Sequence, residues 1–456
     1  ACLATSLGLP VNAAVTIPGD PLASGVRVAP NILFVLDDSG SMASDYMPDN
    51  VPSTSTPNVS LHAYTRNSLS YNPAASYEPW MNADGNRLTG GTSYTSAYSA
   101  TQAVPYTGVK DDDTTGVITT SGTINLAGQV RTFYVPKDTN DKTAAYLGNG
   151  ANYYRYQITP NGKIYRSEWK TSGATTSPSI SNNLGTFNGT WAGNYSGTWN
   201  FLASAYAYGL TISTSGGSVS PVTDRGVDLY IRQNNSTVDT ANYTAAGTNA
   251  DNTESITRGV SGSEITWYVR LYSNTAFSGT VTAAYTFDLC KTTGSDLAWR
   301  DCTEMTTLPG TGRTIAQELV HYATWYSYFR TRNKVAKAGA AEAFSATSLG
   351  NKVRVGFTTI WNANPFYIPV GDGNDGRFVN NDGTNGNSAT KSRAKWYSHL
   401  FKAGGNSTTP LRPALNSAGS YFSNTLSGYT DANGPYGPET GSAVLSCRQN
   451  FTILTT

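Results

Sequence analysis

Residues 30–41, PNILFVLDDSGS, decide how this chain folds. The apolar run over residues 32–36 ends abruptly at two aspartates. Such a run is typical of a central strand in a parallel sheet, because a strand covered on both faces has no polar side. In open α/β sheets, ligands bind at the carboxyl ends of the strands. We therefore expect Asp37 and the residues after it to lie at a binding edge.

The loop after this strand carries the residue types of a site for a hard cation. Asp37, Ser39 and Ser41 alternate along it, so that one carboxylate and two hydroxyls can turn toward a single ion, and Gly40 permits a sharp bend. Oxygen ligands with water in the remaining positions favour Mg²⁺, with Ca²⁺ or Mn²⁺ as alternatives. The competing interpretation is a polar turn that only caps the strand. The apolar strand before the loop and Met42 after it favour the metal site.

The other elements of an α/β unit lie far along the chain. No helical pattern follows Ser41 within the few residues that a compact α/β domain would use. Apolar periodicity and turn residues predict the remaining elements: a helix over 314–348, a strand over 352–360, helices over 389–403 and 411–422, and a strand over 451–455. This order predicts a doubly wound, Rossmann-like α/β domain with a large insertion after its first strand.

The insertion is predicted to be mostly β, in two parts. Residues 46–196 are rich in tyrosine, threonine and turn residues, and their topology does not follow from the pattern. Residues 197–290 contain alternating segments such as 227–232 (VDLYIR) and 266–272 (TWYVRLY), separated by Gly, Asn and Ser. Alternation with such turns predicts an antiparallel β-sandwich with Leu229, Ile231, Trp267, Val269 and Leu271 in its core. This segment resembles the prepeptidase C-terminal-type sandwich of secreted bacterial proteins.

Composition excludes some classes of function. The 456 residues carry a formal net charge of +1, and 13% are charged, against about 25% in an average protein. No basic field exists to attract nucleic acid. No run of about 18 apolar residues exists, so no transmembrane segment is expected. Residues 1–14 resemble the end of a secretory signal peptide, and we interpret them as its remnant.

The cysteines suit an exported protein. Cys290 and Cys302 flank a short polar stretch and are expected to form a disulfide, whereas Cys2 and Cys447 have no evident partner. Without a Cys-x-x-Cys motif or a Cys/His cluster, zinc is not expected.

The strand followed by Asp37-x-Ser39-Gly40-Ser41-Met42 resembles the metal-ion-dependent adhesion site of von Willebrand factor A domains. The resemblance implies that residues 15–45 and 291–456 are the two parts of one such domain. In that family a threonine from a second loop joins the site. Residues 405–415, GNSTTPLRPAL, are similar to that loop, with Thr409 as the better match and Thr408 as the alternative. The family's third-loop aspartate would follow the strand at 451–455, beyond residue 456.

Further stretches resemble the PilY1/PilC-type tip proteins of type IV pili, namely residues 36–50, 71–80, 325–332 and 436–454. The resemblance implies a secreted, non-enzymatic adhesin and assembly factor at the pilus tip or outer membrane of a Gram-negative bacterium. Its partners would be minor pilins or a host or surface receptor that offers an acidic side chain to the metal.

Two other functions remain as alternatives. One is a generic secreted A-domain binding protein without a pilus role. The other is a metal-assisted hydrolase, which the sequence disfavours because it has three histidines and no nucleophile elbow. The Asp/Asn-rich stretch over 372–385 resembles pieces of a calcium loop, but it lacks the glutamate at the twelfth position and is interpreted as a turn.

Overall fold

The computed structural model describes most of the chain in segments, and every structural statement below concerns these residues: 28–47, 59, 62–83, 85–99, 110–111, 116–117, 122–128, 130–173, 180–191, 194–203, 207–215, 226–249, 253–258, 265–287, 298–345, 353–363, 365–370, 393–404, 408–430, 434–437 and 448–456. The expected signal-peptide remnant and the Asp/Asn-rich stretch lie outside them.

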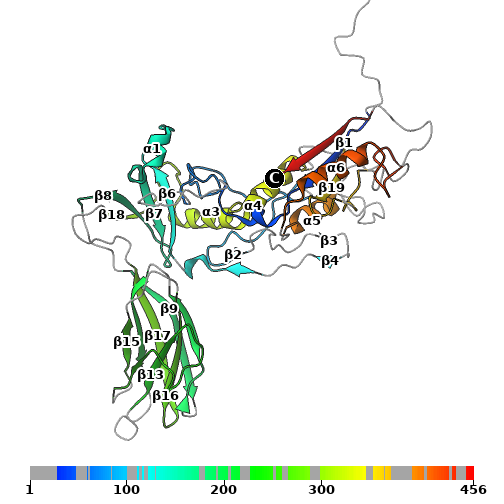
Figure 1. Ribbon diagram of the computed structural model, residues 1–456. Coiled ribbons are helices and arrows are strands. Elements are labelled where there is room, and N and C mark those ends of the chain that lie inside the picture. The colour runs from blue at the N-terminus through cyan, green and yellow to red at the C-terminus, as the bar shows by residue number, and fades with distance from the viewer. Residues whose placement is uncertain are drawn as a thin grey trace, which may run out of the picture.

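A parallel sheet organises the α/β part of the molecule (Figure 1). Strand β1 (Asn31–Leu36) lies between β19 (Arg354–Thr359) and β20 (Asn450–Thr455), and both neighbours run parallel to it. The sequence predicts this central position for the apolar run. In the described sheet β20 is an edge strand, and its Phe451 and Ile453 side chains are exposed.

Helices pack on both faces of this sheet. Phe34 and Leu36 belong to an apolar cluster with α4 (Arg332–Ala343) and α5 (Arg393–Lys402). Leu33 and Val35 point the other way and join a cluster with α6 (Leu411–Phe422). Because successive side chains of a strand alternate between its faces, the continuous apolar run of β1 supplies both cores.

The single helix expected over 314–348 is two helices, α3 (Ile315–Tyr328) and α4. Thr314 starts α3 with a capping box, and Thr331 caps α4 by accepting from the Lys334 amide. Donors from outside α3 satisfy its last carbonyls: Lys334 Nζ donates to the Ser327 carbonyl at 2.6 Å, and Trp80 Nε1 donates to the Tyr328 carbonyl at 2.8 Å. These side-chain donors replace the backbone amides of a further helical turn, which would otherwise bond to these carbonyls.

The first part of the insertion contains a four-stranded antiparallel sheet in the order β18-β8-β7-β6. Its strands are β6 (Arg131–Pro136), β7 (Tyr153–Ile158), β8 (Ile164–Lys170) and β18 (Ala298–Met305). The predicted return to the α/β domain at residue 291 is therefore too early, because β18 still pairs with β8. Aromatic residues of this sheet pack on α3, as Phe133 does on Tyr322.

Short elements complete this part of the chain. They are η1 (Gly40–Ala43), β2 (Ala97–Tyr98), β3 (Lys110–Asp111), β4 (Gly116–Val117), β5 (Thr123–Ile124), η2 (Leu126–Gly128), α1 (Ala144–Gly148) and η3 (Gly150–Asn152).

Two antiparallel sheets form the elongated β body at the bottom of Figure 1. One has the order β10-β16-β13-β14 with β11 also on β16, and the other has the order β15-β12-β17-β9. The strands are β9 (Ile180–Trp191), β10 (Asn194–Tyr195), β11 (Trp199–Ala203), β12 (Ala207–Ser215), β13 (Asp228–Gln233), β14 (Ala245–Gly247), β15 (Ser255–Arg258), β16 (Ile265–Ser273) and β17 (Phe277–Phe287).

The five side chains expected in the core of this sandwich, from Leu229 to Leu271, are all buried. The expected start at residue 197 is wrong, because β9 and β10 precede it and belong to the two sheets. Strand β9 pairs with β17 along its whole length, so the sandwich includes residues from Ile180 onward.

Cys302 is disulfide-bonded, as the sequence predicts. Its expected partner Cys290 lies outside the described residues, as do Cys2 and Cys447.

A buried polar network holds the segment around Tyr71 against α3. The Tyr71 hydroxyl lies within hydrogen-bonding distance of both the Glu318 carboxylate and Nδ1 of His321, which is 2.6 Å away. Nε2 of His321 donates to the Ala75 carbonyl at 2.9 Å, and Arg313 pairs with Glu318 at 2.7 Å. Burial, with the positive charge of Arg313, lowers the pKa of His321 from 6.5 to about 4.

This pKa predicts how stability depends on pH. Between pH 6.5 and about 4 the unfolded chain binds a proton at His321 that the folded chain does not. Stability should therefore fall as the pH is lowered through this window, by at most about 3 kcal/mol from this group. Urea unfolding of the wild type and His321→Gln at pH 7 and pH 4.5 should show a smaller pH dependence in the variant. An unchanged pH dependence would contradict the assignment.

The sandwich should fold by itself from Ile180 but not from residue 197. A chain of residues 180–287 retains β9 and therefore both neighbours of β17, whereas residues 197–290 expose that edge of β17. We expect cooperative urea unfolding for the longer segment and a weak or absent transition for the shorter one. Tryptophan fluorescence would follow both. Equal cooperativity in the two would show that β9 is dispensable.

Candidate metal centre

The carboxyl ends of the three parallel strands lie at one edge of the sheet. The Asp37 amide donates to the Thr455 carbonyl at 2.8 Å, and the Ile360 amide donates to the Leu36 carbonyl at 3.0 Å. These bonds extend the ladder of β1 on both sides to the point where the loop begins. The position of the Asp37 backbone is therefore fixed by the sheet itself.

The loop from Asp37 to Ser41 folds into a compact turn. The Ser39 amide donates to Asp37 Oδ1 at 2.9 Å, and the hydroxyl oxygens of Ser39 and Ser41 lie 3.0 Å apart. The 3₁₀ turn η1 follows, in which the Met42 amide donates to the Ser39 carbonyl and the Met42 side chain is buried. Asp37 and Ser39 are buried, whereas Gly40 and Ser41 are exposed, so the site opens to solvent on the side of Ser41.

A hydroxyl group from the residue after β20 also bonds to Asp37. Thr456, directly after β20, donates from Oγ1 to Asp37 Oδ2 at 2.7 Å. The two carboxylate oxygens of Asp37 thus accept from two different segments of the chain.

Trp361, at the end of β19, connects the Asp37 loop with the segment that contains the predicted threonine ligand. Its amide lies 3.4 Å from Asp38 Oδ1, and its indole Nε1 donates to the Thr408 carbonyl at 2.6 Å. Thr408 and Thr409 are both exposed and precede α6. The helix begins at Leu411, as the sequence predicts, with Pro410 in the N-cap position. That the Thr409 hydroxyl converges with Asp37, Ser39 and Ser41 stays a prediction.

Asp38 is buried next to Asp37 in the loop. Its negative charge raises the pKa of the buried Lys337, but burial outweighs this effect and lowers that pKa to about 7. Lys337 Nζ also donates to the Phe401 carbonyl at 3.0 Å, at the end of α5. Asp38 therefore contributes to the electrostatics beneath the loop, beside the buried Asp37 and Ser39.

The helix that packs against the loop is α4. The Arg332 amide donates to the Ser44 carbonyl, and its guanidinium donates to the carbonyls of Tyr46 and Met47. Of the single helix expected over 314–348, the first part, α3, packs on the sheet of the insertion instead. The break between α3 and α4 allows the second helix to reach the loop.

The donor set of the loop is one carboxylate with hydroxyl groups. Among the described residues no three His, Cys, Asp or Glu side chains gather as a metal-binding group. Any cation here would depend on Asp37 and on hydroxyl oxygens. Sequence reasoning missed Asp38, Trp361, Lys337 and Thr456 as neighbours of the site, although Trp361 and Thr456 both follow strands that the sequence predicts.

Comparison with known proteins gives one limited similarity. A stretch of 141 residues, 30% of this chain, is 30% identical to the type IV pilus biogenesis factor PilY1 of Pseudomonas aeruginosa. The stretch spans 11% of that protein. No protein-family model matches the chain.

A similarity to one solved structure is weak. A chain from the structure of infectious bursal disease virus Gx strain aligns with 44% of this chain and 43% of its own length, at 10% identity and a TM-score of 0.13. At this score the match carries no argument. In the described part of the chain, no helix has both the length and the apolar character needed to cross a membrane.

The Trp361 indole should order the segment before α6. Trp361→Phe keeps an aromatic ring but loses the bond to the Thr408 carbonyl. The loss of about 1 kcal/mol for one hydrogen bond should speed hydrogen exchange around residues 408–414 by roughly five-fold. Exchange in β1 should stay unchanged. Equal exchange rates around 408–414 in the variant and the wild type would show that the bond does not hold this segment.

Proposed function

We propose that the chain is a pilus-associated adhesion and assembly factor that binds its partners through a divalent cation held at the Asp37 loop. The observation that carries the proposal is the compact turn at the carboxyl end of β1, where Ser39 and Ser41 turn their hydroxyls toward each other beside the buried Asp37. On this proposal the three parallel strands and their helices belong to a doubly wound, von Willebrand factor A-type domain.

The spacing of the two serine hydroxyls fits Mg²⁺. In octahedral Mg²⁺ sites the ligands lie about 2.0–2.1 Å from the ion, so adjacent ligands are about 2.8–3.0 Å apart. The two hydroxyl oxygens are 3.0 Å apart. Ca²⁺, with six to eight ligands at about 2.3–2.6 Å, tolerates a similar spacing, so the preference for Mg²⁺ rests on the donor set of one carboxylate with hydroxyl groups and water. Asp37, Ser39, Ser41 and Thr409, with Thr408 as the alternative, would hold the ion, and Mn²⁺ is the closest substitute.

The protein's part in recognition is to present this edge of the sheet without blocking it. A bound cation would supply an open position for a carboxylate of the partner. Asp37 is fixed by the strand ladder, so little ordering is needed when the partner arrives. The Trp361 side chain is 43% exposed beside the loop and offers an aromatic contact of the kind that dominates interface energies.

The similarity to PilY1 supports a pilus-related role at the cell surface. The disulfide at Cys302 agrees with an oxidising compartment outside the cytoplasm. Minor pilins or a surface receptor with an acidic side chain would be the partners. The matched stretch spans 11% of PilY1, so any activity of the whole PilY1 protein is assigned to this chain only as part of this proposal.

Titration calorimetry of the chain with Mg²⁺, Mn²⁺ and Ca²⁺ tests the metal site. We expect Mg²⁺ and Mn²⁺ to bind more tightly than Ca²⁺. Asp37→Asn should abolish binding because it removes the formal charge that faces the ion, and Ser39→Ala or Ser41→Ala should weaken it by about ten-fold or more. Thr409→Ala and Thr408→Ala decide between the two threonines.

Asp45→Asn is the matched control, because it removes an exposed carboxylate four residues beyond Ser41. It should bind metal as the wild type does. Metal binding by Asp37→Asn at wild-type affinity would end the proposal for the site. A bacterium that carries Asp37→Asn and still assembles pili and adheres normally would end the proposal for the pilus role.

A further inference from the structure

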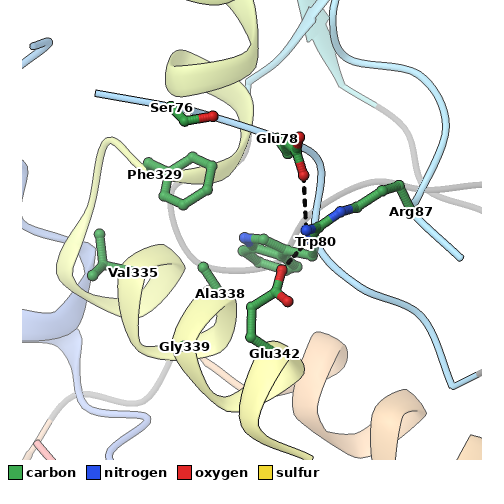
Figure 2. Close-up of a pocket in the computed structure, with 9 residues that line it drawn as sticks. All are labelled: Ser76, Glu78, Trp80, Arg87, Phe329, Val335, Ala338, Gly339 and Glu342. Atoms are coloured by element: carbon green, nitrogen blue, oxygen red, sulfur yellow. Dashed lines mark hydrogen bonds and ion pairs between the residues drawn. The ribbon is translucent and has the colours of Figure 1, made fainter. Parts of the chain in front are cut away.

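A groove of about 420 Å³ lies along α4 (Figure 2). It is lined by Ser76, Glu78, Trp80, Arg87, Phe329, Val335, Ala338, Gly339 and Glu342. Three of these residues belong to the stretch over 71–80 that the sequence analysis singles out. The proposed metal site uses none of them.

The floor of the groove is apolar and well anchored. Trp80 is 1% exposed, and its indole Nε1 donates to the Tyr328 carbonyl, so only the ring contributes to the groove. The wall is one stripe of α4, in which Val335, Ala338, Gly339 and Glu342 follow the three- and four-residue spacing of a helix face. Phe329 closes the end where α3 passes into α4.

Gly339 has no side chain to fill the groove along this wall. A glycine inside a helix costs about 1 kcal/mol relative to alanine. A β-carbon added at Gly339 would meet no atom within 4 Å, so packing within the described chain does not require the glycine. The residue leaves space in the groove that a larger side chain would occupy.

The rim carries charge. Arg87 lies between Glu78, at 2.8 Å, and Glu342 (Figure 2). The two carboxylates and one guanidinium give the rim a net charge of −1. The Glu78 side chain is 57% exposed and that of Glu342 is 49% exposed. Ion pairs this exposed contribute little to stability, so an incoming cation can exchange with Arg87 at small cost.

We propose that this groove binds an extended segment of a partner protein that presents a large apolar side chain next to a lysine or arginine. The apolar side chain would contact the half-buried Phe329 and Val335 and lie over the exposed Gly339. The cation would pair with Glu78 or Glu342. The volume exceeds one side chain and suits an anchor with part of its flanking backbone. The negative rim selects against segments whose anchor is flanked by acidic residues.

The groove and the metal site have opposite requirements. The metal site takes an acidic side chain and needs the cation, whereas the groove takes a basic segment and needs no metal. Lys337, whose Nζ bonds to the Phe401 carbonyl, lies on a different face of α4 from the groove stripe. The groove proposal therefore does not depend on the metal site, and an experiment can contradict either one without contradicting the other.

Selection of a displayed library of random dodecapeptides on the folded 456-residue chain tests the groove. We expect enriched sequences to contain an aromatic residue, leucine or methionine within two positions of a lysine or arginine. A synthetic peptide of the enriched sequence is then titrated by fluorescence anisotropy. Gly339→Leu, which fills the groove, should weaken binding about ten-fold or more.

Matched variants separate the groove from general damage. Gly339→Ala should bind within about two-fold of the wild type and raise the melting temperature, because it relieves the cost of a helix glycine without filling the space. Glu78→Gln with Glu342→Gln should weaken binding several-fold and reduce its dependence on salt. EDTA and Asp37→Asn should leave peptide binding unchanged.

Three results would overturn the proposal. The first is a selection that enriches no sequence, or only sequences without a basic residue. The second is a peptide that binds Gly339→Leu as tightly as Gly339→Ala. The third is binding that EDTA or Asp37→Asn abolishes, since the peptide would then occupy the metal site.

Discussion

The parallel pairing of β1 on both of its sides is the constraint on which the rest of the structure depends. Its partners β19 and β20 come hundreds of residues later, so the chain must leave this sheet after Ser41 and return to the same place. The entropic cost of closing a loop grows only slowly with its length. A long insertion is therefore tolerable if it makes enough contacts of its own, as the β-sandwich does, or packs on a neighbouring helix, as the four-stranded sheet does on α3. The register of β1 then fixes Asp37 at the sheet edge irrespective of the insertion.

The sequence could predict the elements whose pattern is local, and it could not predict those set by distant contacts. The strands β1 and β19 and the helix α6 were all predictable because each shows a local pattern of apolar residues. The break after Tyr328 was not, because apolar spacing continues through Phe329 and the carbonyls are satisfied by Trp80 and by Lys334. Strand β9 was missed for a similar reason: it is rich in Asn, Gly and Thr, and its place follows from its pairing with β17.

For the candidate metal centre, the sequence identified the residues contributed by one strand and its loop. Asp37, Ser39 and Ser41 are contiguous, so their common position follows from the strand alone. Thr456 and Trp361 required knowledge of which strands lie beside β1. The rule that parallel strands end at one edge could have found both, because each residue follows a predicted strand closely. The charge of Lys337 near Asp38 had no such signal, since lysine in a helix is ordinarily exposed.

Helix α4 connects the two candidate binding surfaces without making them one. Arg332 at its start fixes the carbonyls of Tyr46 and Met47, just after the Asp37 loop, and the stripe through Gly339 forms the groove. A helix packed along one side in this way holds both surfaces at a constant separation. A partner that offers an acidic side chain to one surface and an apolar-basic segment to the other would gain from the second contact as an intramolecular step. Two weak contacts on a rigid frame would then bind a partner selectively, because a partner with only one of the two features gains neither the geometry nor the added affinity.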